Sequence, residues 1–360
     1  MDYGIEPFDG GTAGEADLRA YHALVAAADA ERFPGFPATP FAAFAAAARR
    51  TRHPLGPHRA WAARAQDGTL CGAASVVYPE REHASAALAR VTVHAAHRRR
   101  GAGTALLCAL VADASAEGRL RLVDEQVPVD SPGAHWARAV GFAEVLRNCW
   151  QLLSVPEVDP ARWVLPAPAG FRIEHWVGVA PEPLVAAFAV ARNAMADAPT
   201  GASGFVAAPW TVERVRRAEA SAAAAGEQLW YAVAVHEATG EVAALTGMIV
   251  DPRRTALCWQ RDTAVVRGHR GRGLAPAVKA AMMRALTAAH PDLGRVITNT
   301  AAENAAMRRV NERIGYVRYA DIGMYQAEVA DLSARLAVGA LPGPRHAALE
   351  HADAEPPGAP

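Results

Sequence analysis

The stretch V-V-R-G-H-R-G-R-G-L-A, at residues 265–275, shows how the chain is organised, because its pattern also stands 172 positions earlier (265 minus 93). The earlier copy reads V-H-A-A-H-R-R-R-G-A-G, at residues 93–103. In both copies an apolar run leads to an arginine, two further residues, a glycine, one residue and a small residue. This shared spacing predicts that the chain is two copies of one unit.

Each copy opens a segment whose composition is compatible with a helix, and such a turn is suited to binding an anion. The N-terminus of a helix carries unpaired backbone N–H groups and a partial positive charge. Small residues let the backbone approach the anion, and glycine also permits a positive φ in the turn. The arginine adds a full charge and a planar fork that fits phosphate. We therefore expect a phosphate or pyrophosphate at each turn.

At these residues the chain resembles the GNAT superfamily of acetyl-coenzyme A-dependent N-acetyltransferases, whose signature is [Arg or Gln]-x-x-Gly-x-[Gly or Ala]. Further along, each match is followed by a glycine and an aromatic residue, Gly141 with Phe142 and Gly315 with Tyr316. The resemblance implies an α/β fold with a mixed sheet, built as two tandem GNAT-like acetyltransferase domains. It also implies acetyl-CoA as the cofactor.

The length of 360 residues fits two domains of ordinary size. We predict a first domain over residues 1–154, a proline-rich linker over 155–169 and a second domain over 170–330. The linker has four prolines and no periodicity, so it should be semi-rigid. Residues 316–328 are predicted to form a closing strand pair. A disordered tail is predicted over 337–360, which is rich in proline, glycine and small residues.

Composition gives no support for several classes of partner. The 37 basic and 37 acidic residues give a formal net charge of zero, which does not favour nucleic acid or a membrane surface. The four cysteines stand singly, so we expect no metal site. No apolar run approaches the roughly 20 residues that span a bilayer, and the polar N-terminus is unlike a signal peptide. We expect a cytoplasmic monomer or homodimer.

The resemblance implies cofactor-binding residues at both turns and, in the second half, on a later helix. They are Val93, Arg98, Arg99, Arg100, Gly101, Ala102, Gly103 and Thr104 in the first half, and Val265, Arg270, Gly271, Arg272, Gly273, Leu274, Ala275, Asn304 and Asn311 in the second. Asn304 is expected to bond the pantetheine arm, with a helix cap as the alternative role. Backbone N–H groups near residues 92–94 and 264–266 are expected to stabilise the developing oxyanion.

Catalysis by this family needs a base, because amines arrive as ammonium ions near neutral pH. Asp262, just before the second turn, is our first candidate, and the alternative is that it faces solvent or pairs with an arginine. Glu303 is the second candidate. Many members of the family also use a tyrosine as general acid, but the matching positions here are Ala137 and Asn311. Tyr316 is therefore the candidate acid, beside water or no acid at all.

The second half has more of these polar residues, so we favour it as the catalytic half and the first as structural or a degenerate cofactor site. Against this, Arg98, Gly101 and Gly103 match the signature better than the second copy does.

A loop in the second half should line the acceptor cleft, because loops above a rigid sheet often carry recognition. Its candidates are Asp197, Thr200 and Trp210. The expected acceptor is a primary amine on a small molecule, with a peptide N-terminus as the alternative. Two rival functions are open: a non-catalytic acyl-CoA sensor or scaffold, and a nucleic-acid module that uses the arginine run at residues 98–100.

Overall fold

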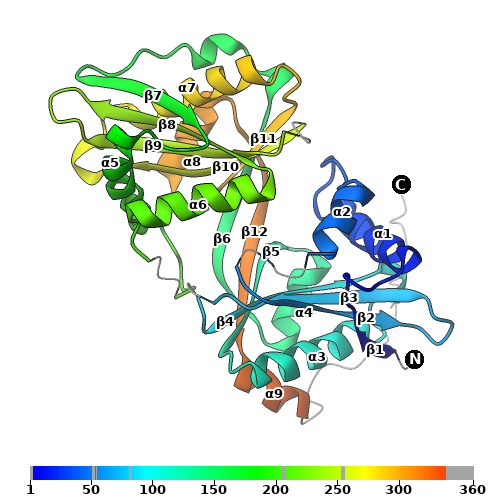
Figure 1. Ribbon diagram of the computed structural model, residues 1–360. Coiled ribbons are helices and arrows are strands. Elements are labelled where there is room, and N and C mark those ends of the chain that lie inside the picture. The colour runs from blue at the N-terminus through cyan, green and yellow to red at the C-terminus, as the bar shows by residue number, and fades with distance from the viewer. Residues whose placement is uncertain are drawn as a thin grey trace, which may run out of the picture.

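The computed structural model describes residues 3–50, 53, 55–80, 83–204, 208–252 and 256–337 (Figure 1). Its strands form one twelve-stranded mixed sheet in the order β1-β2-β3-β4-β5-β12-β6-β11-β10-β9-β8-β7. This confirms the predicted α/β class with a mixed sheet. Among the described residues, no helix has both the length and the apolar character needed to cross a membrane.

In the first half, two helices follow the first strand, three strands come in succession, and helices and strands then alternate. Its elements are β1 (Gly4–Pro7), α1 (Glu15–Arg32), α2 (Phe41–Ala48), β2 (His58–Arg64), β3 (Leu70–Val77), β4 (Ala86–Val93), η1 (Ala95–His97), α3 (Ala102–Ala116), β5 (Arg121–Pro128), α4 (Pro132–Val140) and β6 (Ala143–Ser154). Local chemistry sets the ends of α4. The Ser131 hydroxyl accepts the Ala134 N–H at 3.1 Å, and Gly141 ends the helix at φ 113°.

The second half repeats this order after two short 3₁₀ turns. Its elements are η2 (Val155–Glu157), η3 (Pro160–Trp163), β7 (Phe171–Val177), α5 (Glu182–Arg192), η4 (Asn193–Asp197), α6 (Val212–Ala225), β8 (Gln228–His236), β9 (Val242–Val250), β10 (Leu257–Val265), η5 (Arg267–His269), α7 (Leu274–Ala289), β11 (Arg295–Ala301), α8 (Ala305–Ile314), β12 (Val317–Glu328) and α9 (Val329–Ala337). The apolar side chains of α7 fill one core with the sheet, and those of α5 and α6 fill another.

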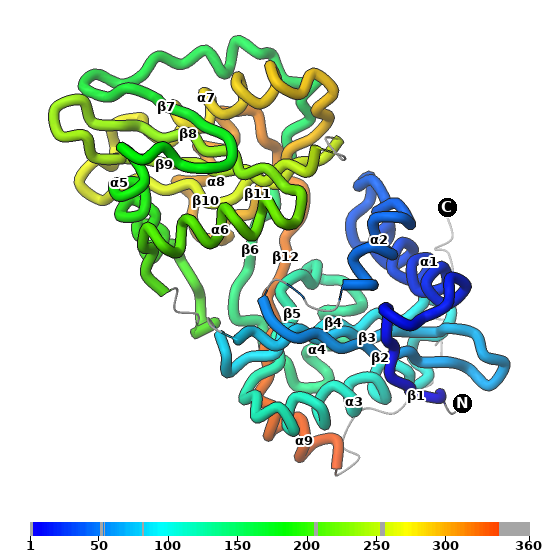
Figure 2. Tube along the Cα trace, in the orientation of Figure 1, coloured from blue at the N-terminus to red at the C-terminus, as the bar shows by residue number. Residues whose placement is uncertain are grey.

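The two halves exchange their last strands. β6 of the first half pairs with β11 of the second, while β12 of the second half pairs with β5 of the first. β6 and β12 also pair with each other, and Figure 2 shows them running side by side between the halves. The predicted strand pair at residues 316–328 is therefore wrong. That region is one twelve-residue strand, because both of its partners come from the first half.

Two further segments join the halves. Helix α9 packs beside α3, with Val329 and Leu332 buried in the core of the first half. The proline-rich segment after β6 is held at Trp163, whose indole is buried in the core of the second half and donates to the Ile314 carbonyl at 2.9 Å. That segment is therefore packed structure, not a solvated spacer. Of the tail predicted over 337–360, Ala337 ends α9 and the rest lies outside the described residues.

Candidate active site

The two predicted turns have the same geometry. In the first, Arg98 Nε donates to the Val93 carbonyl at 3.2 Å; in the second, Arg270 Nε donates to the Val265 carbonyl, also at 3.2 Å. Each guanidinium is also paired with a carboxylate. Glu31 of α1 accepts two bonds from Arg98 at 2.6 and 2.5 Å, and Asp197 accepts one from Arg270 at 2.6 Å. Both arginines therefore tie their turn to a strand and to an acidic residue.

The ion pair in the first half affects the titration of its carboxyl group. Hydrogen bonding from Arg98 lowers the pKa of Glu31. Glu31 is therefore ionised near neutral pH and holds Arg98 in place. The next two arginines, Arg99 and Arg100, are exposed and free to approach an anion at the turn. Arg99 has φ 61°, and Gly271 takes the same left-handed conformation in the second half at φ 78°.

Beyond the turns, the two central parallel strands of each half separate. β4 and β5 pair from Ala86 with Arg121 to Leu88 with Val123, and then diverge. The His94 N–H donates to the Cys71 carbonyl on β3 at 2.9 Å. Because successive strand N–H groups point to opposite sides, those of Val93 and Val91 face the gap. The same reasoning turns the Val265 N–H toward the gap in the second half, since Val266 donates to the Ala243 carbonyl.

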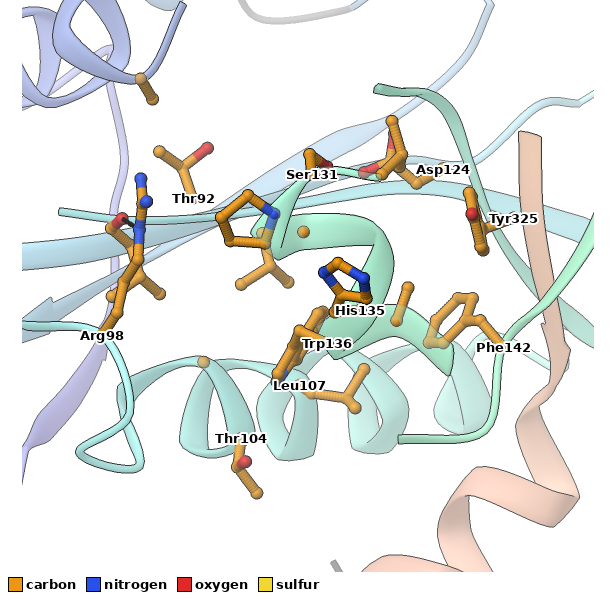
Figure 3. A pocket seen from close by; sticks show the side chains of 18 of the residues that line it. Thr92, Arg98, Thr104, Leu107, Asp124, Ser131, His135, Trp136, Phe142 and Tyr325 are labelled. Atoms are coloured by element: carbon orange, nitrogen blue, oxygen red, sulfur yellow. Dashed lines mark hydrogen bonds between the residues drawn. The ribbon is translucent and has the colours of Figure 1, made fainter. Parts of the chain in front are cut away.

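The gap in the first half opens into a cavity of about 810 Å³ between β4, β5, α3 and α4, and α1 borders it as well. Figure 3 shows Arg98 at one end, Trp136 and His135 of α4 along the middle, and Phe142 and Tyr325 at the other end. Six of the residues predicted to bind the cofactor line it: Val93, Arg98, Arg99, Gly101, Gly103 and Thr104. The cavity thus lies in the half that the sequence analysis took as structural or degenerate.

In the second half, side chains fill the corresponding space. Lys279 of α7 is 1% exposed, and its Nζ donates to Gln260 Oε1 at 2.5 Å. The same oxygen accepts the Tyr316 hydroxyl at 2.6 Å. Burial lowers the pKa of Lys279 to about 7. Helices α7 and α8 also pack against each other, so buried side chains occupy the region of the second half that corresponds to the cavity.

Three residues predicted to act in the second half make contacts inside the fold. Tyr316 is 1% exposed, burial raises its pKa, and its side chain lies in the core of the second half. Asn311 is fully buried and donates to Gln151 Oε1 at 2.8 Å, away from the turn. Asn304 Oδ1 accepts the Met307 N–H at 3.1 Å, which is the helix cap given as the alternative.

Asp262 is engaged in an ion pair. Its carboxylate accepts a bond from Arg192 at 2.7 Å, and the Arg192 side chain is 8% exposed. This matches the alternative reading, in which Asp262 pairs with an arginine. The Arg192 guanidinium also lies 3.3 Å from the ring centroid of Trp210, with Arg214 4.0 Å from the same ring. Trp210 is thus held by two cations.

The remaining predicted substrate residues lie on or near the same loop. Asp197 is bound to Arg270, and Thr200 is exposed and accepts the Ser203 hydroxyl at its carbonyl oxygen, at 2.7 Å. Glu303, the second candidate base, is exposed and lines a shallower cavity of about 320 Å³ together with Gly201.

Comparison with protein-family models identifies the family of this chain. Residues 22–142 match the Acetyltransferase (GNAT) family, and residues 182–317 match the Acetyltransferase (GNAT) domain. Together the two matches cover more than half of the chain. The chain belongs to the GNAT acetyltransferase family. The tandem resemblance is thereby confirmed, and so is the class of enzyme, an acyl-CoA-dependent N-acetyltransferase. GNAT domains generally use acetyl-CoA and act on amines of small molecules or proteins.

Solved GNAT structures share the whole tandem fold. A tandem GNAT protein from the clavulanic acid biosynthesis pathway matches with a TM-score of 0.73 and 23% identity, over 91% of this chain and 99% of that one. A GCN5-related N-acetyltransferase from Sphaerobacter thermophilus matches with a TM-score of 0.68 and 18% identity, over 91% and 96%. At these identities the likeness shows the fold alone. The comparison with curated proteins gives no match.

Two residues that the sequence analysis missed line the cavity of this GNAT chain. Asp124 lies on β5, one residue beyond the last parallel pair with β4, and is half-buried. Its position after the apolar residues Leu122 and Val123 could have indicated a carboxylate at the strand separation. Tyr325 comes from β12 of the second half. Nothing in the local sequence could have placed it there, because strand exchange brings it into the first half.

Proposed function

We propose that this GNAT enzyme transfers an acetyl or longer acyl group directly from acyl-CoA to a primary amine of a small molecule, within a ternary complex in the first half. The observation that carries the proposal is the cavity of about 810 Å³, which reaches from the signature turn past the separated strands to α1. Two reactants held together in such a slot gain effective molarity. The filled second half supports the choice of the first as the catalytic half.

The donors around the cavity fit the cofactor. The N-terminal N–H groups of α3 and the exposed Arg99 and Arg100 would hold its phosphates. The Val91 and Val93 N–H groups face the gap, where they can bond an amide of the pantetheine arm or the reacting carbonyl oxygen. When bound, acyl-CoA supplies an activated thioester carbonyl.

Asp124 is the base in this proposal. Its carboxylate lies at the cavity wall beside the strand separation, where it can take the proton of an incoming ammonium ion. Gln126 N donates to Asp124 Oδ1 at 3.1 Å, which leaves the other oxygen for the substrate. Glu31, the other carboxylate at the cavity, is already bound twice by Arg98. Ala137 stands where many family members have their acidic tyrosine, so the thiolate leaves without a side-chain acid at that position.

The second half has a structural role in this proposal. Residues 1–154 and 170–330 are two repeats in sequence, but β12 and α9 of the second complete the sheet and core of the first. The acceptor proposed, a small amine, agrees with a chain of zero net charge, which does not attract a strongly charged polymer.

Calorimetry with acetyl-CoA on the full chain tests the site. Arg100 and Arg272 are matched residues, since both are exposed and both stand two positions after the signature arginine. We expect one bound acetyl-CoA per chain, an affinity roughly tenfold lower in Arg100→Glu, and no change in Arg272→Glu. Two sites, or loss in Arg272→Glu alone, would contradict the assignment to the first half.

A panel of small amines, with released thiol as the readout, tests the activity. Turnover that is lost in Asp124→Asn while acetyl-CoA still binds is the expected result. Tight acetyl-CoA binding with no turnover of any amine or peptide would favour the sensor, the function that the missing tyrosine suggests.

A further inference from the structure

The end of the cavity farthest from the turn is apolar and lies deep in the fold. Leu110 of α3 and Leu122 of β5 line it, and both are 1% exposed or less. Leu122 pairs with Ala87, which is on the closed side of the strand separation. Leu110 is nine residues along α3 from Gly101, a rise of about 13 Å. The cavity therefore continues well below the turn, and at Leu122 it reaches past the point where the strands part.

Tyr325 and Phe142 close this end (Figure 3). The Tyr325 hydroxyl donates to Glu144 Oε2 at 3.1 Å, and the Arg138 guanidinium lies 5.4 Å from the ring centroid. These contacts fix the ring, and the hydroxyl already has its partner. The aromatic face is therefore what Tyr325 offers to the cavity. Asp124 is its cross-strand partner, so the carboxylate lies beside Tyr325, and the apolar wall is formed by Tyr325, Phe142, Leu110 and Leu122.

The second half shows that the fold itself does not require this space. The equivalents of Leu107, Ala137 and Phe142 are Lys279, at an offset of 172 residues, and Asn311 and Tyr316, at an offset of 174 that the two Gly-aromatic pairs share. All three are buried and hydrogen-bonded to neighbouring side chains. The first half instead has apolar groups here, and at position 137 only a methyl group, which leaves the space open.

Protein interiors are close-packed, and an apolar space of this kind binds apolar ligands better than water. We propose that the deep end is an acyl-chain pocket and that the preferred donor is an acyl-CoA longer than acetyl. The inference rests on the proposed function of the first half. Chain length does not alter the bonds: one ammonium proton passes to Asp124, the carbon–nitrogen bond forms as the acyl carbon–sulfur bond breaks, and a second proton goes from nitrogen to the thiolate, which leaves as CoA thiol.

Calorimetry on the full chain with CoA, acetyl-, butyryl- and hexanoyl-CoA tests the pocket without an acceptor. Affinity should rise about fourfold for each added methylene until the pocket is full. Equal affinity for all three thioesters would overturn the pocket but leave the proposed function standing. Failure to bind even CoA would instead overturn the proposed function, and the pocket with it.

Two substitutions test which residues form the pocket. Ala137→Phe fills the space beside Tyr325, and we expect the preference for hexanoyl- over acetyl-CoA to fall at least tenfold. Ala139→Phe, on the exposed face of the same helix, is the matched control and should change nothing. Tyr325→Leu replaces the large ring at the end of the pocket by a smaller side chain. The preferred acyl chain should therefore become longer. An unchanged chain-length profile in both Ala137→Phe and Tyr325→Leu would refute the assignment of this end.

Discussion

Replacing Lys279 by methionine should make the protein more stable at neutral pH. Lys279 is the single lysine in the 360-residue sequence, and it is 1% exposed. Within the part of the chain that the structure describes, its one hydrogen bond is to Gln260 Oε1, and no carboxylate pairs with it. A charged ammonium group in such a place lacks the solvation that it has in the unfolded chain.

The size of this stability cost follows from the pKa of the Lys279 amine. Burial lowers this pKa from 10.5 to about 7. The difference corresponds to a free-energy cost of roughly 5 kcal/mol for burying the charged amine. Because the folded pKa is below the unfolded one, the folded state binds fewer protons between these values. The free energy of unfolding therefore rises with pH across that window. Below the folded pKa of about 7, burial of the charged lysine destabilises the folded state by its full amount. Above pH 10.5 the amine is neutral in both states, and this destabilisation disappears.

Methionine has a similar length and fills irregular core space without a charge. It loses the bond to Gln260, worth about 1–2 kcal/mol, while Gln260 still accepts the Tyr316 hydroxyl. We expect Lys279→Met to gain roughly 3 kcal/mol at pH 7 and to lose about 1 kcal/mol at pH 10.5, where the lost hydrogen bond is the main difference. Lys279→Arg keeps its charge throughout and should be destabilised at both pH values.

Urea unfolding of the three proteins at several pH values measures these differences. Lysine labelled with ¹³C gives one side-chain resonance, so its titration can be followed directly. The reasoning is wrong if Lys279→Met is less stable than the parent at pH 7, or if its advantage does not shrink as the pH rises. A lysine resonance that titrates near 10.5 would be equally decisive.

The other predictions concern catalysis, the linker segment and a helix cap. Asp124→Asn should reduce turnover at least a hundredfold with the acetyl-CoA affinity unchanged, whereas Asp262→Asn should retain turnover; steady-state kinetics and calorimetry compare them. Trp163→Ala should cost about 3–5 kcal/mol in denaturant unfolding because the indole is buried and bonded to Ile314, and a cost below 1 kcal/mol would contradict its place in the core. Asn304→Ala should cost about 1 kcal/mol through loss of the cap and leave acetyl-CoA binding intact; weaker binding would restore the pantetheine role.

Local chemistry explains why the sequence predicted the turns well. Arginine, glycine and a following helix define each turn within eleven residues, and both arginines make the same bond to their strand. The caps at Ser131 and Thr211 are equally local. The choice of half depended on packing instead. Polar residues in the second half suggested chemistry, but Lys279 and Asn311 are buried and donate hydrogen bonds to Gln260 and Gln151 in the core.

Strand exchange explains the rest of what the sequence did not predict. The apolar pattern of residues 317–328 predicts a strand but not its partners, and these lie far away in the chain, on β5 and β6. The exchange has a functional consequence, because it brings Tyr325 into a cavity otherwise built by the first half. A second repeat can therefore lose its own cofactor space and still be needed for the site.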